Sequence, residues 1–226
     1  VTALPGDYLV QQPAKGDFAL VGKNSVAQIQ LDSMDHKGLQ RAVKSLQQDI
    51  QNVSGRQLQS GSTSSATNLV IIGSLGKSAL LDQLVSTGKL DVSAISGRWE
   101  AYQIQLIQNP LPGVTQALVI AGSDKRGAIF GVYDLAETIG VSPWHWWADV
   151  PVKQQPQLYI KAGTRLTDAP KVKYRGIFLN DEYPALTQWT TEKFGGYNSQ
   201  FYLHVFELLQ RLKANFLWPA MWNNAF

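Results

Sequence analysis

Short apolar runs alternate with amphipathic stretches along the first two thirds of the chain, and this alternation constrains the fold more than any other feature. Residues 69–72 and 117–121 are continuous apolar runs, as expected of strands that are covered on both faces. Before the first of these runs, five apolar residues recur at helical spacing: Leu39, Val43, Leu46, Ile50 and Val53. Strands that alternate with helices predict a mixed α/β sheet flanked by helices.

The same pattern continues to about residue 162. Within residues 102–106, apolar residues alternate with Gln103 and Gln105, which predicts a strand with one face more exposed to solvent. Asp124 precedes a second amphipathic helix that Gly140 closes. Residues 163–173 contain Pro170 and few apolar side chains, so we expect an N-terminal α/β domain over 1–162 and a linker over 163–173.

The remaining segment, 174–226, predicts one strand, a loop, one helix and a second strand. The strands are expected at 174–179 and 215–218, and Asn198 is expected to cap the helix between them. Strand, helix and strand in this order form a parallel crossover. Such a unit cannot stand alone, because two strands and one helix leave most of their apolar faces unburied.

Composition excludes several classes of function. The 20 Lys and Arg against 17 Asp and Glu give a net charge of +3, too small for a nucleic-acid-binding surface. No apolar stretch is long enough for a membrane span. There is no Cys, and His36, His145 and His204 have no ligand partner at helical spacing, so a zinc site has little support.

Residues 73–78 superficially resemble a phosphate-binding loop, because Gly73 and Gly76 follow an apolar run and precede a helix. The nucleotide-binding pattern needs four residues between its glycines, and this chain has two. A tight turn between a strand and a helix is therefore the favoured interpretation.

The densest aromatic cluster contains Trp144, Trp146 and Trp147. Indole rings can stack on sugar rings, so the cluster fits a carbohydrate platform. They also supply large buried areas, so it fits a packed junction between domains, which is the interpretation that we favour.

Polar residues follow both predicted strands of the C-terminal segment. Asn180, Asp181 and Glu182 come directly after the first strand, and Trp222 and Asn223 follow the second. The carboxyl ends of parallel strands are the edge at which ligands bind in α/β architectures. Acids and amides bond hydroxyl groups while indoles stack on sugar faces, so this edge predicts a carbohydrate site; a helix cap or loop ion pair is the structural alternative for the two acids.

Three segments of this region carry a family resemblance. They are residues 174–182 (Tyr-Arg-Gly-Ile-Phe-Leu-Asn-Asp-Glu), 192–198 (Glu-Lys-Phe-Gly-Gly-Tyr-Asn) and 212–222 (Leu-Lys-Ala-Asn-Phe-Leu-Trp-Pro-Ala-Met-Trp). Together they resemble glycoside hydrolase family 115, the xylan α-1,2-glucuronidases. The segment from Gly122 to Trp144 resembles the α/β domain that precedes the barrel in this and related glycosidase families.

The resemblance implies an α/β domain followed by a (β/α)8 TIM barrel, of which residues 174–226 would be the first, incomplete part. It implies an inverting hydrolase that removes glucuronic acid or 4-O-methylglucuronic acid from glucuronoxylan or its oligosaccharides, without metal or cofactor. Asp181 is carried over as a pocket carboxylate and a candidate participant in catalysis. Asn180, Glu182, Trp222 and Asn223 are candidate substrate-binding residues.

A barrel typically needs about 250 residues, whereas 226 − 173 = 53 follow the linker. We therefore expect an N-terminal portion of a longer enzyme that is inactive alone, packs on the remainder of its own barrel and lacks the general acid. The polymeric substrate implies a secreted or periplasmic protein. The full-length form is compatible with a homodimer. The alternatives are a non-catalytic carbohydrate-binding or adaptor module and another barrel glycosidase, such as a β-hexosaminidase.

Overall fold

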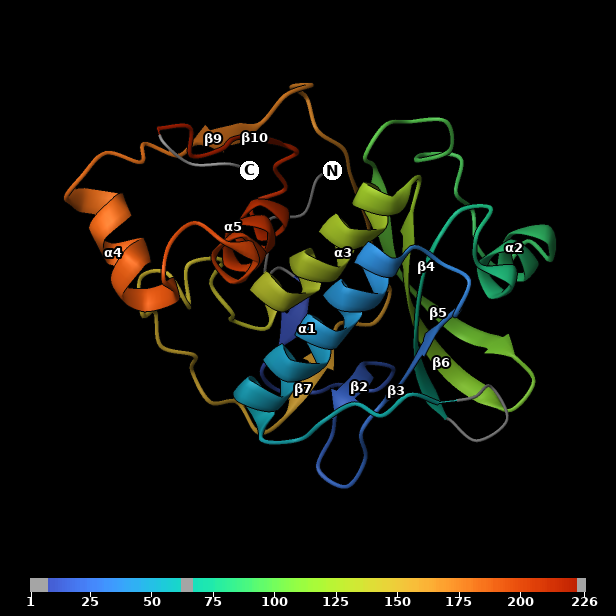
Figure 1. Cartoon of the computed structure of the whole chain (residues 1–226). Helices are drawn as coiled ribbons and strands as arrows, with labels where there is room; N and C mark the ends of the chain where they lie inside the picture. Colours follow the sequence, from blue (N-terminus) through green and yellow to red (C-terminus); the bar gives the residue numbers. More distant parts are fainter. Residues whose placement is uncertain (1–7, 62–66, 223–226) are drawn as a thin grey trace. The chain divides into compact units, whose positions relative to one another are not determined.

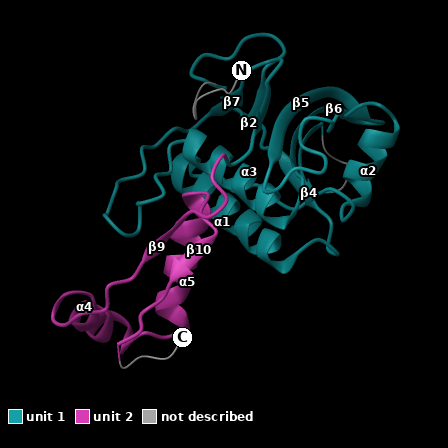
Figure 2. Ribbon diagram, turned by 90° about the horizontal axis from the view of Figure 1, so that it is seen from above, with its two compact units in different colours: residues 1–170 teal, residues 171–226 magenta. Residues whose placement is uncertain are grey.

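The computed structural model describes residues 8–61 and 67–222. The chain divides into two compact units, residues 1–170 and 171–226, which Figure 2 shows in teal and magenta. Asn223, one of the residues predicted to bind substrate, lies outside the described residues.

A five-stranded sheet with the strand order β3-β4-β6-β5-β8 forms the centre of unit 1. β3, β4 and β6 are mutually parallel, and β5 pairs antiparallel with both β6 and β8. A smaller sheet has the order β1-β7-β2. The strands are β1 (Leu9–Val10), β2 (Phe18–Val21), β3 (Gln28–Leu31), β4 (Asn68–Ser74), β5 (Tyr102–Leu111), β6 (Val114–Gly122), β7 (Leu158–Ile160) and β8 (Arg165–Asp168).

Three helices cover the larger sheet (Figure 1). They are α1 (Lys37–Ser54), α2 (Ala79–Ser86) and α3 (Lys125–Thr138). The side chains of α1 and α3 share one apolar cluster with Val70 and Ile72, whereas those of α2 pack with Leu69 and Ile71. Successive residues of a strand point to opposite faces, so α2 lies on the face opposite to α1 and α3. The predicted mixed α/β sheet flanked by helices is thereby confirmed.

The junction between β6 and α3 requires small residues. Asp124 precedes α3 and caps it by accepting a hydrogen bond from the Gly127 N–H at 2.8 Å. A Cβ atom on Gly122 would lie 2.0 Å from the Ala128 nitrogen, and one on Gly127 would lie 2.1 Å from the Ala101 carbonyl oxygen. Strand and helix therefore approach each other at a distance that only glycine permits.

Two expectations for unit 1 differ from the structure. Residues 165–168 fall inside the expected linker, yet they form β8 and pair with β5, because alternating Leu166 and Thr167 suit the edge of a sheet. Gln103 was expected on a wet face but is fully buried. Its amide nitrogen donates to the Asp91 carbonyl at 3.0 Å and to the Gln105 side chain at 2.8 Å, whereas its buried oxygen has no hydrogen-bond partner among the described residues.

Unit 2 contains two parallel strands and two helices. The elements are β9 (Gly176–Phe178), α4 (Ala185–Phe194), α5 (Ser199–Arg211) and β10 (Phe216–Trp218). β9 and β10 pair in parallel, with Gly176 opposite Phe216 and Phe178 opposite Trp218, so the predicted parallel pair is confirmed. A Cβ atom on Gly176 would lie 1.9 Å from the Phe216 carbonyl oxygen, so the strands meet where only glycine fits.

One helix of unit 2 was not predicted. α4 occupies the segment expected to be a loop between Pro184 and Gly195, and Thr190 is its only buried residue. It therefore has no apolar stripe from which the sequence could have revealed it. α5 begins as predicted, because the Asn198 side chain accepts hydrogen bonds from the N–H groups of Gln200 and Phe201.

Candidate functional site

The ends of β9 and β10 meet at one edge of unit 2. The Leu179 N–H donates to the Trp218 carbonyl at 2.9 Å, which continues the pairing one residue beyond β9. Asn180, Asp181 and Glu182 follow at this edge, and residues 219–222 follow β10. The structure therefore joins the two polar segments that the sequence predicted to lie at neighbouring strand ends.

Asp181 connects these two segments. It is only 3% exposed, and its Oδ2 atom accepts hydrogen bonds from the N–H groups of Met221 at 3.0 Å and Trp222 at 2.8 Å. Hydrogen bonds to an ionised carboxylate are shorter and stronger than those between neutral groups. The carboxylate therefore fixes the backbone that follows β10.

The other predicted residues are more accessible. Asn180 and Glu182 flank Asp181 and are exposed, while the Trp222 side chain is 56% exposed. The structure thus separates two roles at this edge. Asp181 holds the scaffold, whereas Asn180, Glu182 and the Trp222 ring are accessible to a ligand.

Three hydroxyl groups support the site, and sequence reasoning missed all of them. Thr187 donates from its hydroxyl to the Asp181 carbonyl, and its oxygen lies 3.1 Å from the Tyr197 hydroxyl. The Tyr202 hydroxyl accepts a hydrogen bond from the Ala220 N–H at 3.2 Å, and burial raises the pKa of Tyr202 above its usual range. Tyr197 lies in the quoted segment 192–198, so the resemblance was the only signal that pointed toward it.

Two cations of unit 2, Arg175 and Lys193, have contacts within the protein. Arg175 precedes β9, at the end opposite to Asp181, and its guanidinium donates to the carbonyl groups of Lys213 at 2.8 Å and Val172 at 2.7 Å. The Lys193 ammonium lies 5.5 Å from the centre of the Trp189 ring. Arg175 therefore stabilises the chain around the start of the strands.

Aromatic residues cover one face of the β9–β10 pair. Phe178 and Trp218 pack edge to face with ring centres 5.3 Å apart, and Tyr174 and Phe216 do so at 6.3 Å. Phe178, Phe216 and Trp218 are each about half-exposed, at 50%, 50% and 53%. Half-exposed aromatic rings on a sheet face are typical of a surface that another part of a protein or a ligand covers.

Unit 1 contains the tryptophan cluster. Trp146 and Trp147 pack edge to face with ring centres 4.9 Å apart, and Trp144 is 44% exposed. His145 Nδ1 lies 3.1 Å from the Ser142 carbonyl oxygen, so this histidine closes a local turn. The interpretation of the cluster as a domain junction stays a prediction.

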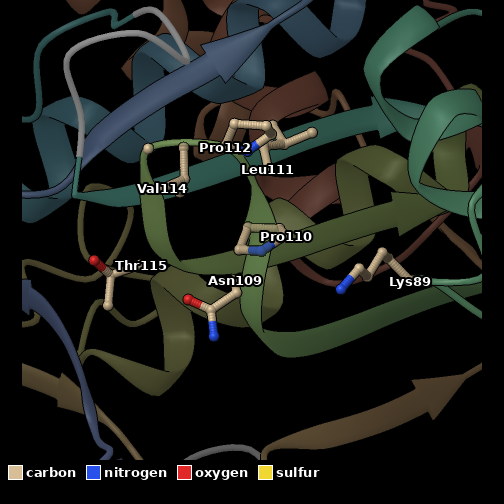
Figure 3. A pocket seen from close by; sticks show the side chains of 8 residues that line it. Lys89, Asn109, Pro110, Leu111, Pro112, Val114 and Thr115 are labelled. Carbon is tan, nitrogen blue, oxygen red and sulfur yellow. The ribbon is translucent and has the colours of Figure 1, made fainter.

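A shallow hollow of about 540 Å³ lies beside the β5–β6 hairpin of unit 1. Lys89 and residues 109–115 line it, and Figure 3 shows their side chains. Its lining includes Pro110, Pro112 and Leu111 but no carboxylate, so it offers no pair of acids for glycoside hydrolysis.

Among the described residues, no His, Asp and Glu side chains gather in groups of three that could hold a metal ion. No helix in the same part of the chain is long and apolar enough to cross a membrane.

In chain order, a mixed α/β unit precedes a parallel strand pair whose carboxyl ends present an acid, an amide and indole rings. This is the order that the resemblance to glycosidases with an α/β domain before a barrel implied. Residues 167–226 match the family model described as glycosyl hydrolase family 115. The resemblance to this family is thereby confirmed over these residues.

Solved structures give a consistent result. The chain is similar to a family GH115 4-O-methyl-α-glucuronidase, BtGH115A, which is described as having specificity for decorated arabinogalactans. The sequence identity is 29% and the TM-score 0.76, over 91% of this chain and 26% of that one. This chain therefore spans about a quarter of the length of that enzyme. No curated protein matches the chain significantly.

More distant structures share the fold alone. Two structures of the Streptomyces plicatus β-hexosaminidase are 14% identical, with TM-scores of 0.51 and 0.50, over 94% of this chain and 32% of those chains. At this identity the likeness supports the arrangement of helices and strands and carries no statement about the reaction.

Proposed function

We propose that this chain is the N-terminal part of a glycoside hydrolase that removes glucuronic acid or 4-O-methylglucuronic acid from the side chains of a plant polysaccharide. The observation that carries the proposal is the family match over residues 167–226, which contain the whole edge built around Asp181. The similarity to a 4-O-methyl-α-glucuronidase supports the same reaction.

The proposed reaction is a hydrolysis with inversion at the anomeric carbon. One carboxylic acid protonates the glycosidic oxygen as its bond to that carbon breaks, while a carboxylate takes a proton from the attacking water. The two carboxyl groups of inverting enzymes stand about 6.5–9.5 Å apart, so that water fits between them. Asp181 and Glu182 are adjacent in sequence, and only Glu182 is exposed.

The chain's own residues would bind and orient the sugar. Asn180 and Glu182 can bond its hydroxyl groups, and the exposed Trp222 ring can stack on its apolar face. Asp181 would keep the backbone under Trp222 in place through its two N–H contacts. The general acid would come from a later strand of a (β/α)8 barrel, packed against the aromatic face of β9 and β10.

The polymer is proposed as glucuronoxylan, with decorated arabinogalactan as the second candidate. The second candidate rests on the described specificity of BtGH115A. Either polymer is too large to enter a cell intact, so we propose a secreted or periplasmic location. A homodimer of the full-length protein is compatible with this proposal.

The test is a substrate panel with the full-length protein. We expect it to release 4-O-methylglucuronic acid from glucuronoxylan or arabinogalactan, with the anomeric configuration inverted in the first product seen by ¹H NMR. The 226-residue chain alone should release none. Release of N-acetylglucosamine from chitobiose in place of a uronic acid would instead assign a β-hexosaminidase.

A carbohydrate-binding or adaptor module is the alternative function. The exposed Trp144 favours it, because an accessible indole can stack on sugar. Loss of polysaccharide binding by a folded Trp144→Ala variant, combined with no hydrolysis by the full-length protein, would support this module over the hydrolase.

A further inference from the structure

The topology of unit 1 creates a crevice that the proposed hydrolase does not use. β3 and β4 are parallel neighbours, paired from Gln28 and Leu69 to Leu31 and Ile72. The chain leaves β3 toward α1 on one face of the sheet and leaves β4 toward α2 on the other (Figure 1). Strand ends whose connections diverge in this way leave an opening, and open α/β sheets bind their ligands there.

A hollow of about 390 Å³ lies at this point of the sheet. Gln30, Asp32 and Ser33 line it from the end of β3, and Ile71 lines it from β4. Ser78 and Leu80 line it from the start of α2. Its volume falls within the range of small-molecule sites, about 300–1,000 Å³. Topology and cavity therefore indicate the same place independently.

The lining has hydrogen-bonding capacity that the described part of the chain leaves unused. The Gln30 amide and the Ser33 hydroxyl have no hydrogen-bond partner among the described residues. Ser78 is 2% exposed, and its oxygen accepts from the Leu81 N–H at 3.4 Å, so its own proton can be donated to a ligand. These groups offer both donors and acceptors.

The Asp32 carboxylate disfavours charged ligands at this site. Its Oδ2 atom accepts from the Ala79 N–H at 3.3 Å, so the carboxylate occupies the start of α2, where an anion would otherwise bind. A phosphate or carboxylate ligand would meet this negative charge. Oδ1 accepts from the Met34 N–H at 2.9 Å, so both oxygens already have donors and a cation gains less from the site.

We propose that this crevice binds one neutral sugar residue. Sugar hydroxyl groups can donate to Asp32 and exchange hydrogen bonds with Gln30 and Ser33, while the C–H face of the ring contacts Ile71 and Leu80. The site lies in unit 1, whereas the candidate catalytic edge lies in unit 2, so it is a second site and its occupancy is independent of hydrolysis.

The test uses the 226-residue chain and ¹H–¹⁵N NMR, with methyl β-D-xylopyranoside as the probe. We expect saturable shifts confined to the amides of residues 30–33 and 78–80, with a Kd of about 1–10 mM. Inorganic phosphate and methylammonium should give no saturable shifts there. Xylotetraose distinguishes the source: tighter binding assigns the site to a residue of a polysaccharide, and equal binding assigns it to a free sugar.

Two variants and one control complete the experiment. Gln30→Leu should weaken binding about tenfold, which corresponds to about 1.4 kcal/mol, whereas Gln83→Leu on the exposed side of α2 should bind like the parent. If Gln30→Leu disturbs the spectrum as a whole, Ser33→Ala tests the other unpaired group of the same lining. The proposal is overturned by shifts elsewhere, by phosphate or methylammonium binding as well as the sugar, or by unchanged binding in folded variants.

Discussion

The Asp181 carboxylate and the Trp222 backbone N–H are joined by a hydrogen bond of 2.8 Å that links the ends of two neighbouring parallel strands. The same oxygen accepts from the Met221 N–H, so one buried side chain fixes two consecutive peptide groups. This arrangement gives Asp181 a positioning role, because it determines where the exposed Trp222 ring stands at the candidate sugar site.

Replacing Asp181 by Ala should destabilise unit 2. The change removes a charged acceptor from two N–H groups, and buried hydrogen bonds of this kind contribute about 1.5–3 kcal/mol each when one partner is lost. Hydrogen exchange at the Met221 and Trp222 amides should accelerate first. Glu182→Ala is the matched control, since this neighbouring acid is exposed and should leave both amides protected. Unchanged protection in Asp181→Ala would refute the positioning role.

Gly176→Ala should weaken the β9–β10 pair. The added Cβ atom would meet the Phe216 carbonyl oxygen at 1.9 Å, so the strands must separate. Overpacking of this kind costs about 1–3 kcal/mol, and we expect a loss of that size in urea unfolding followed by the indole N–H NMR signal of Trp218.

Gly38→Ala is the same chemical change as Gly176→Ala, but we expect it not to destabilise the protein. Gly38 lies in α1, and its added Cβ atom would meet Ile129 at an ordinary contact distance of 3.4 Å. Ala is the better helix former by about 1 kcal/mol, so this variant should be as stable as the parent or more so. A similar loss in both variants would show that the close approach of Gly176 to Phe216 is not the cause.

The sequence predicted those features that depend on periodicity or on a local cap. The α1 stripe, the buried runs of β4 and β6 and the Asn198 cap all follow from patterns within a few residues of one another. α4 could not be predicted, because its only buried residue is Thr190 and no apolar stripe marks it. β8 was missed because short edge strands carry few apolar residues.

The candidate site could be predicted as a location but not as a set of contacts. The polar residues after β9 and β10 identified the edge, because parallel strands end on the same side. That Asp181 is buried and bonds the chain 40 residues later depends on the tertiary register, which no local pattern contains. Tyr202 could not be predicted for the same reason, because the contact of its hydroxyl with the Ala220 N–H also depends on the tertiary structure.

Asp124→Ala should destabilise unit 1 by about 1–3 kcal/mol. The Asp124 carboxylate caps α3 through the Gly127 N–H at 2.8 Å and also accepts from the Glu100 N–H at 2.9 Å, so its loss leaves two donors without an acceptor. Asp82→Ala is the control: Asp82 is exposed and accepts from the Gly76 N–H at 3.3 Å. Thermal unfolding monitored by circular dichroism compares the two, and equal losses would contradict a special contribution of Asp124.

Because of Tyr102, the free energy of unfolding of unit 1 should decrease above about pH 10. Its hydroxyl donates to Asp134 at 2.6 Å, and burial together with the Asp134 charge raises the pKa of Tyr102 far above its ordinary value of 10.0. The unfolded chain then loses this proton near pH 10 while the folded chain keeps it, so the stabilisation is complete below pH 10 and declines as pH rises.

Tyr102→Phe tests this linkage. At pH 7 the variant should be less stable by about 1–3 kcal/mol, because Asp134 loses a buried donor. The difference in the free energy of unfolding between parent and variant should become smaller at alkaline pH. In the parent, Tyr102 ionises in the unfolded chain and thereby lowers the stability, whereas the variant has no such group at this position. Tyr159→Phe is the control at pH 7, since the Tyr159 hydroxyl donates to Gln157 in an exposed position, and urea unfolding should show only a small difference there. A gap that stays constant for Tyr102→Phe between pH 7 and about pH 11 would contradict the raised pKa of Tyr102.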